Sequence, residues 1–271
     1  MRFRFWPLIL CWAILGDPDE KCHGSFSIRH SAFSVREFAL TAQPTLVFIS
    51  GLGADARLFT PQQALPWPIR VVEWIEPQRR EPLAGYAERL VERVKVEKPF
   101  FLGGVSMGGM IALEMSRWME PEAVFLIASA RSGRAINPLF RACGRLIGGA
   151  PLWAGLPPAI AKPVALLLVK YTVRRADHLT HEQAELCRQM AADASPRFVR
   201  WGCRATVGWP GVDLPRVAVY HIHGDRDRMM PLRRVKPDHV VRGGGHLINL
   251  THADEVNAYV VAKGKSHLPK P

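Results

Sequence analysis

Residues 100–115 read FFLGGVSMGGMIALEM, and this stretch decides the fold. Residues 100–105 form a continuous apolar run with two glycines, which is typical of a buried strand. Residues 107–119 are rich in Ala, Leu, Met and Glu, which favour a helix. A buried strand that turns into a helix at Ser106 predicts one half of a βαβ unit.

The same alternation extends to both sides of this stretch. Apolar runs predict further strands over residues 46–49, 70–75, 123–127, 217–222 and 240–241. Apolar residues at helical spacing predict helices over residues 83–96 and 254–262. Strands that alternate with helices in this way are typical of βαβ units. We therefore expect an α/β fold with a mostly parallel, doubly wound sheet.

The alternation stops after Ser129 and resumes near residue 211. Between these points, helical patches at residues 139–147, 165–173 and 182–192 are broken by proline and glycine. We expect a helical cap over residues 131–210, inserted into a core formed by residues 44–130 and 211–265. Residues 131–205 hold 12 Lys and Arg against 4 Asp and Glu, so this insertion carries most of the net charge of +12.

The composition excludes several classes of protein. With 271 residues, 48% of them apolar and 22% charged, the chain is an ordinary globular sequence and not a disordered or low-complexity one. No apolar run reaches the roughly 18–20 residues that a bilayer span needs. Five cysteines without a CxxC pair argue against a disulfide scaffold and a structural zinc site. The charge of +12 favours an anionic partner or substrate, or a solubilising surface.

The amino terminus has some features of a signal sequence. Arg2 and Arg4 precede a short apolar stretch over residues 6–15, but no Ala-x-Ala cleavage site follows. We expect residues 1–43 to form an N-terminal extension and the protein to be cytoplasmic. Export, or membrane association through residues 1–16, is the alternative.

The turn Gly104-Val-Ser106-Met-Gly108 has the G-x-S-x-G pattern between a strand and a helix. A serine on such a sharp turn has a strained backbone, and small residues on both sides let neighbouring backbones approach. The N–H groups and the dipole of the helix that follows favour a developing oxyanion at this point. Ser106 is therefore a candidate nucleophile.

A serine hydroxyl is a weak nucleophile and needs a base. His246 follows three glycines after a short strand, so it can reach over the carboxyl edge of the sheet towards Ser106. Either Asp225 or Asp227, which follow another strand, could orient this histidine. The chain order Ser, Asp, His is the order expected for a parallel sheet with this turn.

Two other histidines lie close to the aspartates. The sequence predicts His223 to be a structural turn residue at the end of its strand. His221 and His223 share one strand face and could hold a metal, but no pattern of carboxylates accompanies them.

Together these residues resemble the α/β-hydrolase superfamily. The resemblance covers residues 45–130 and 215–262, with a helical cap at the usual place. It depends on four features, which are Ser50-Gly51-Leu52-Gly53, the turn at 104–108, H-G-x-x-D-x-x-x-P at 223–231, and Gly245-His246. It implies Ser106 as nucleophile, Asp227 as acid and His246 as base. It also implies an oxyanion hole formed by the backbone N–H groups of Leu52 and Met107.

One position departs from the family pattern. The residue before Gly51 is usually histidine in the family, and here it is Ser50. Because the oxyanion donors are backbone groups, we expect the hole to survive. The hydrogen bonds that shape this loop, and with them the substrate preference, would differ.

The resemblance implies a serine hydrolase that cleaves a carboxylic ester, or a related acyl compound, through an acyl-enzyme. No metal and no organic cofactor is implied. We expect a small-molecule acyl substrate in an apolar pocket with a basic rim, which suits an anionic or lipid-like compound or contact with a membrane surface. Since the chain has no nucleic-acid-binding module, no nucleic acid is expected.

Two alternatives stay open. The first is a non-catalytic binding module with the same fold. The second is a dinucleotide-binding protein, because residues 51–56 match G-x-G-x-x-A after a strand and Glu76 follows some twenty residues later. Asp55 and the prolines after this loop weaken the second alternative, which also leaves residues 104–108 and 223–246 unexplained.

Overall fold

The computed structural model describes residues 43–149, 178–212 and 216–268, without the side chains of residues 146–149. The predicted helix over residues 165–173 and nearly all of the predicted N-terminal extension lie outside these ranges. Within them, no helix is both long enough and apolar enough to cross a membrane.

Six strands form one sheet in the order β2-β1-β3-β4-β5-β6, and every neighbouring pair is parallel. The strands are β1 (Thr45–Ile49), β2 (Ile69–Val71), β3 (Phe100–Val105), β4 (Ala123–Ile127), β5 (Ala218–Gly224) and β6 (His239–Val241). Because all strands are parallel, their carboxyl ends lie at one edge of the sheet. The prediction of an α/β fold with a parallel sheet is confirmed.

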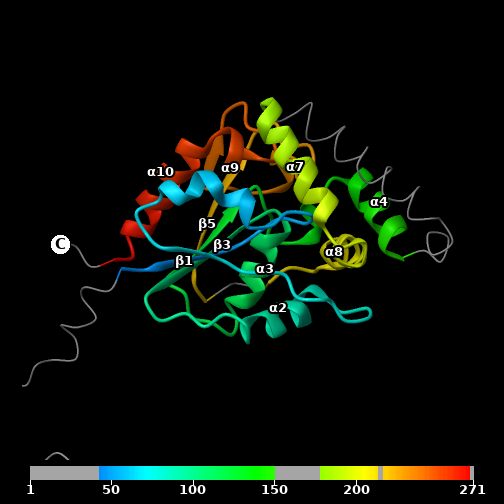
Figure 1. Ribbon diagram of the computed structural model, residues 1–271, viewed down its shortest axis with the longest axis horizontal. Coiled ribbons are helices and arrows are strands. Elements are labelled where there is room, and N and C mark those ends of the chain that lie inside the picture. The colour runs from blue at the N-terminus through cyan, green and yellow to red at the C-terminus, as the bar shows by residue number, and fades with distance from the viewer. Residues whose placement is uncertain (1–42, 150–177, 213–215, 269–271) are drawn as a thin grey trace, which may run out of the picture. The chain divides into compact units, whose positions relative to one another are not determined.

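Helices cover both faces of the sheet (Figure 1). Helices α2 (Leu83–Val91) and α3 (Met107–Met115) pack on one face. The 3-10 helix η1 (Ala56–Ala64) packs on the other face with α9 (Ile248–Thr251) and α10 (Ala253–Lys265). Strand β1 shows why two layers are needed, because Val47 and Ile49 pack on the first face and Leu46 and Phe48 on the second.

Several elements are shorter than predicted. Strand β2 ends at Val71 instead of Ile75, although the N–H of Val72 still donates to the carbonyl of Phe48 in β1. The hydroxyl of Tyr86 donates to the carbonyl of Ile75 and accepts from its N–H. The indole N–H of Trp74 donates to the carbonyl of Ala54. At Ile75, the side chain of Tyr86 thus takes up the backbone groups that a longer strand would pair with β1.

The segment between β4 and β5 contains three described α-helices, α4 (Pro138–Gly149), α7 (His181–Asp193) and α8 (Pro196–Gly208). Helix α8 packs along α4 and also touches α2 and α3. This helix was not predicted, although Ser195 accepts a hydrogen bond from the N–H of Phe198 and Pro196 occupies the first turn. Serine followed by proline is a helix-start signal that the sequence carries. Short 3-10 turns, η2 (Gly133–Ala135) and η3 (Leu232–Arg234), complete the described elements.

Candidate active site

Ser106 sits at the junction of β3 and α3 with φ 56° and ψ −121°. A positive φ is strained for a residue with a Cβ atom and persists only where the surroundings enforce it. Here the N–H of Ser106 donates to the carbonyl of Ile127 over 3.0 Å. The carbonyl of Ser106 accepts a 2.6 Å hydrogen bond from the buried hydroxyl of Ser129. The end of strand β4 and the residues that follow it therefore hold both the N–H and the carbonyl of the strained residue.

Glycines allow this turn to form. A Cβ atom at Gly104 would lie 2.3 Å from the carbonyl carbon of Gly108. A Cβ atom at Gly108 would lie 2.1 Å from the carbonyl oxygen of Ile49. In both places the obstacle is backbone, which cannot move aside. The small residues of the G-x-S-x-G pattern thus have the steric role that the sequence predicted for them.

The structure brings Ser106, His246 and Asp227 together in one chain of hydrogen bonds. The Oγ atom of Ser106 lies 3.0 Å from Nε2 of His246, and Nδ1 of His246 lies 2.7 Å from Oδ2 of Asp227. A carboxylate can only accept, so Nδ1 of His246 carries the proton and Nε2 is free to accept from the serine hydroxyl. The three side chains follow β3, β5 and β6, so the shared carboxyl edge of the sheet gathers them.

The loops after β5 and β6 are fastened to each other. The N–H of Arg226 donates to the carbonyl of Gly244 over 2.8 Å. The carboxylate of Asp225 accepts the N–H of Gly243 over 2.8 Å. Asp225 therefore braces the loop that carries His246, and Asp227 is the aspartate that contacts this histidine.

The carboxylate of Asp227 is buried and fully bonded. Its Oδ1 atom accepts the N–H groups of Met229 and Met230, each over 2.8 Å. Burial alone would raise the pKa of Asp227, but the charge that His246 can acquire and hydrogen bonds from His223 and His246 lower the pKa below its usual range. Asp227 is accordingly an anion that can stabilise a cationic His246.

His223 is not the turn residue that the sequence predicted. It belongs to β5, is fully buried, and places Nε2 2.7 Å from the carbonyl of Met230 and 3.3 Å from Oδ2 of Asp227. Its Nδ1 atom lies 3.2 Å from Nε2 of His221. The strand was predicted to stop at residue 222, yet the alternation of residues 219, 221 and 223 was a signal that it continues. Among the described residues, no group of three or more His, Cys, Asp or Glu could hold a metal ion.

The two predicted oxyanion donors lie beside the serine. A Cβ atom at Gly51 would come within 3.6 Å of Cβ of Ser106, so the turn that carries Leu52 runs next to the nucleophile. Met107 is the first residue of α3, and its N–H has no acceptor within the helix. Helix α8 covers both residues, because a Cβ atom at Gly202 would meet Leu52 Cδ1 at 2.4 Å and Met107 Sδ at 3.1 Å.

Ser50, which departs from the family pattern, closes the same turn. It is buried, and its hydroxyl donates to the carbonyl of Ala54 over 3.0 Å. The carbonyl of Ala54 also accepts from the indole of Trp74. A short side chain at position 50 therefore shapes the loop through one local hydrogen bond.

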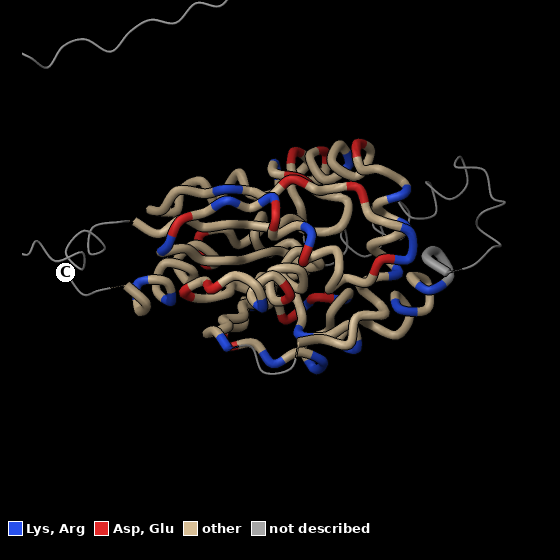
Figure 2. The backbone as a smooth tube through the Cα atoms, turned by 90° about the horizontal axis from the view of Figure 1, so that it is seen from below, with Lys and Arg blue, Asp and Glu red and all other residues tan. Residues whose placement is uncertain are grey.

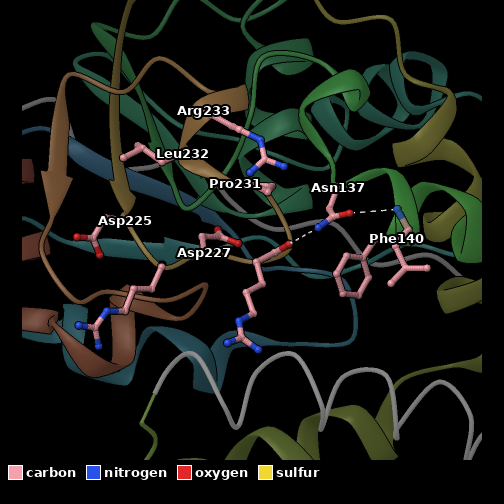
Figure 3. A pocket seen from close by; sticks show the side chains of 10 residues that line it. Asn137, Phe140, Asp225, Asp227, Pro231, Leu232 and Arg233 are labelled. Carbon is pink, nitrogen blue, oxygen red and sulfur yellow. Dashed lines mark hydrogen bonds between the residues drawn. The ribbon is translucent and has the colours of Figure 1, made fainter.

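A cavity of about 520 Å³ opens beside the loop that carries Asp227 (Figure 3). Its apolar lining residues are Leu139, Phe140, Pro231 and Leu232, and its basic ones are Arg226, Arg228 and Arg233. The side chain of Asn137 fastens the loop to the start of α4, since Nδ2 donates to the carbonyl of Arg228 and Oδ1 accepts from the N–H of Leu139. Asp225 and Asp227 also line the cavity, although the side chain of Asp227 is unexposed.

The chain is similar to a known protein family over most of its length. The model of the alpha/beta hydrolase family matches residues 22–259. A chloroperoxidase-like protein of Synechocystis sp. is 46% identical over 57 residues, which cover 17% of this chain. That match spans only 21% of the length of the Synechocystis protein.

Solved structures share the fold at low sequence identity. An esterase from Thermogutta terrifontis with malate bound has a TM-score of 0.62 at 15% identity, over 83% of this chain and 91% of that chain. A hydrolase from Oleispira antarctica has a TM-score of 0.67 at 12% identity, over 83% and 92%. A mutant of the N-acyl homoserine lactonase AidH, with N-hexanoyl homoserine, has a TM-score of 0.62 at 17% identity, over 84% and 91%. At sequence identities this low, the structural similarity shows a common fold and nothing more.

Proposed function

This chain belongs to the alpha/beta hydrolase family, and on that basis we propose that it is a serine hydrolase that cleaves a carboxylic ester through an acyl-enzyme. The observation that carries the proposal is the unbroken chain of hydrogen bonds from Ser106 through His246 to Asp227. A serine aligned with a neutral imidazole, which is aligned with a buried carboxylate, is the arrangement that activates a hydroxyl for acyl transfer.

In the acylation half-reaction, Oγ of Ser106 attacks the ester carbonyl while Nε2 of His246 takes the hydroxyl proton. Asp227 stabilises the imidazolium that forms. The N–H groups of Leu52 and Met107 donate to the tetrahedral oxyanion, which the positive end of the α3 dipole also favours. Collapse of the intermediate breaks the bond to the leaving oxygen, and His246 returns its proton to the departing alcohol.

Deacylation repeats these steps with water. Nε2 of His246 takes a proton from the water that attacks the acyl-enzyme, and the same two N–H groups hold the second oxyanion. Collapse releases the carboxylic acid, and the proton returns to Oγ of Ser106. The residues carry protons and hold charge, and no metal or organic cofactor takes part in this proposed cycle.

The dinucleotide alternative fits the 51–56 loop poorly. A pyrophosphate would need the free N-terminus of the following helix. In this chain the carboxylate of Asp55 occupies that position, because it accepts the N–H of Arg57 over 2.9 Å. Asp55 also pairs with the guanidinium of Arg57. A second anion at this point would meet a carboxylate.

The proposal is tested by labelling with a fluorophosphonate probe, with the modified residue located by peptide mass spectrometry. Wild-type protein is expected to react at Ser106, and Ser106→Ala and His246→Ala should lose the label. Ser116→Ala is the matched control, since this serine lies at the far end of α3 and bonds to Leu113. Folded wild-type protein without label at Ser106 would overturn the proposal and favour the non-catalytic binding module.

We also propose that the small-molecule substrate carries an anionic group. The support is the cavity beside Asp227, which apolar side chains line together with three exposed arginines. The carboxylate of Asp225, which also lines it, is bonded to the N–H of Gly243. Among the contacts of the described residues, Arg226, Arg228 and Arg233 form no ion pair with a carboxylate, so their charges are available to a ligand. Figure 2 shows basic residues spread over many elements and not gathered on one helix. The proposal of an anionic substrate therefore depends on the arginines that line the cavity.

Two esters of equal acyl length separate charge from size. The p-nitrophenyl monoester of succinate should have a higher kcat/KM than p-nitrophenyl butyrate, and the ratio should fall as salt is added. In the double variant Arg228→Gln, Arg233→Gln we expect a loss of preference of about two- to fivefold, as for partly exposed ion pairs. Arg242→Gln is the control, because Arg242 directly follows β6 and does not line the cavity. A salt-independent ratio of one would contradict an anionic substrate.

The segment over residues 131–210 is proposed as the cap of this site. The support is the contact of α8 with Leu52 and Met107, both beside the nucleophile. A cap here would exclude water and form the wall of the acyl pocket.

A further inference from the structure

Two buried histidines on β5 have no part in the proposed cycle. His221 and His223 are 1% and 0% exposed. They alternate with Ile222, which packs on the opposite face of the sheet, so both rings lie on the same side of the strand. A buried polar ring costs free energy unless its nitrogens are hydrogen-bonded, so their partners need an account.

The partners form a chain that ends at the acid. Nε2 of His221 lies 3.2 Å from Nδ1 of His223. Nε2 of His223 lies 2.7 Å from the carbonyl of Met230 and 3.3 Å from Oδ2 of Asp227. The same Oδ2 atom is 2.7 Å from Nδ1 of His246.

The chemistry of the acceptors fixes the direction of this chain. A carbonyl and a carboxylate only accept, so the proton of His223 is on Nε2 and is shared between Met230 and Asp227. Nδ1 of His223 faces Nε2 of His221, and the ring of His221 also has a hydrogen bond with the backbone of Ser129. Burial, followed by the neighbouring His223, lowers the pKa of His221 to about 3, which keeps this ring neutral.

The result is a carboxylate held from three directions. Met229 and Met230 donate to Oδ1, while His246 and His223 donate to Oδ2. Without His223, the Oδ2 atom would keep only His246 and would face the space of the missing ring. Rotation of the carboxylate would then cost less, and Oδ2 would lose its alignment with His246.

We propose that His223 is a positioning residue that holds the carboxylate of Asp227 in line with His246. The inference rests on the proposed function, because alignment of His246 matters to activity only if Ser106 is the nucleophile. It adds a buried histidine as a support behind the acid.

The test compares two polar, uncharged replacements of His223. The amide nitrogen of glutamine reaches about as far as Nε2 of histidine, whereas that of asparagine reaches only as far as Nδ1. His223→Gln therefore keeps a donor for Asp227, and His223→Asn does not. His223→Leu removes every polar atom of this side chain.

The main readout is the second-order rate constant for fluorophosphonate labelling of Ser106, counted per folded molecule. We expect a fall of about 10- to 100-fold in His223→Asn and His223→Leu, the cost that the loss of a partner behind the ligand has at metal sites. His223→Gln should stay within a few fold of wild type. Melting temperatures are measured on the same samples, since a merely structural role predicts that labelling and stability fall together in all variants.

A second readout needs no reaction. The Nδ1–H proton of His246 in its bond to Asp227 should give a strongly deshielded NMR resonance, which should weaken or shift in His223→Asn and stay in His223→Gln. Equal labelling rates in wild type and His223→Asn, or an equal loss in His223→Gln and His223→Asn, would overturn the positioning role. If wild type is not labelled at Ser106, the proposed function fails, and this resonance alone decides whether His223 aligns Asp227. Should His223→Leu not fold, the Gln and Asn variants carry the comparison.

Discussion

The two regions that meet at His246 hold their side chains by different means. In the nucleophile turn, residues 104–109, a Cβ atom added to Gly104 or Gly108 would lie 2.3 or 2.1 Å from backbone atoms. Only glycine therefore fits at these two positions. In the acid turn, residues 224–230, the carboxylate of Asp227 is held by hydrogen bonds from two backbone N–H groups and two imidazoles. The first region is fixed by steric exclusion and the second by polar contacts.

The nucleophile turn and the acid turn should therefore tolerate different kinds of substitution. A side chain added to the nucleophile turn meets atoms that cannot move, so the fold itself should fail. A polar group changed in the acid turn leaves the shape intact and alters charge and proton positions, so activity should fail first.

The largest effect is expected from Gly108→Val. Its side chain would enter the space of the carbonyl oxygens of Ile49 and Ser50, which belong to a central strand and its end. We expect the free energy of unfolding to fall by more than about 4 kcal/mol, or no folded protein. Urea unfolding measures this, with Gly208→Ala as control. A Cβ atom there meets nothing within 4 Å, so a stable Gly108→Val protein would remove the steric basis of the comparison.

Asp227→Asn should leave the fold in place and remove activity. The asparagine can still accept the N–H groups of Met229 and Met230, but its amide would face Nδ1 of His246 and favour the wrong tautomer. The expected loss in kcat is about 10⁴-fold, as for the acid of a serine protease triad. Asp225→Asn is the matched control and should lose little, since asparagine also accepts the N–H of Gly243. Similar rates in both variants would mean that Asp227 does not orient the base.

His221 should make the protein less stable in acid. Its pKa is lowered to about 3 in the fold, by burial, by His223 and by Arg131, and is near 6.5 when unfolded. Between these values the unfolded chain binds the additional proton, so stability rises with pH and is lost on acidification. The contribution is at most about 1.4 kcal/mol per pH unit.

Urea unfolding at several pH values from 6.5 to 4.5 checks this, because Asp227, whose usual pKa is 3.8, contributes only below that window. In His221→Leu the free energy of unfolding should change less steeply with pH. The reduction in slope should be at most about 1.4 kcal/mol per pH unit, which corresponds to one proton. An unchanged slope would show that His221 titrates normally in the folded protein.

The smallest effect on activity and stability is expected from Gly202→Ala, because the atoms that the new methyl group would meet are the ends of flexible side chains. In Gly202→Ala the new methyl group meets Leu52 Cδ1 and Met107 Sδ, both of which can shift. Since these residues carry the proposed oxyanion donors, kcat/KM should fall a few fold while the melting temperature changes little. A loss as large as that of Asp227→Asn would mean that α8 controls the site as strictly as the backbone of the nucleophile turn does.

The sequence was informative where local geometry decides. Strands β3 and β4 were predicted with the bounds observed, because continuous apolar runs between glycine, proline and serine leave little freedom. It was less informative where a side chain competes with a ladder or a cap. Strand β2 stops early at the bonds of Tyr86, and α8 was missed although Ser195 and Pro196 mark its start.

By itself, the sequence determined the α/β class and the strained turn at Ser106, because both follow from periodicity and from glycine spacing within a few residues. The residue pattern left Asp225 and Asp227 open as partners of His246, the family resemblance implied Asp227, and His223 was assigned to a turn. Only the tertiary structure showed the contact of Asp227 with His246, the bond of Asp225 to Gly243, and the position of His223 at 3.3 Å from the carboxylate of Asp227. These contacts depend on how two loops at one edge of the sheet close on each other, and residues far apart in the chain carry no local sign of the atoms that they will meet.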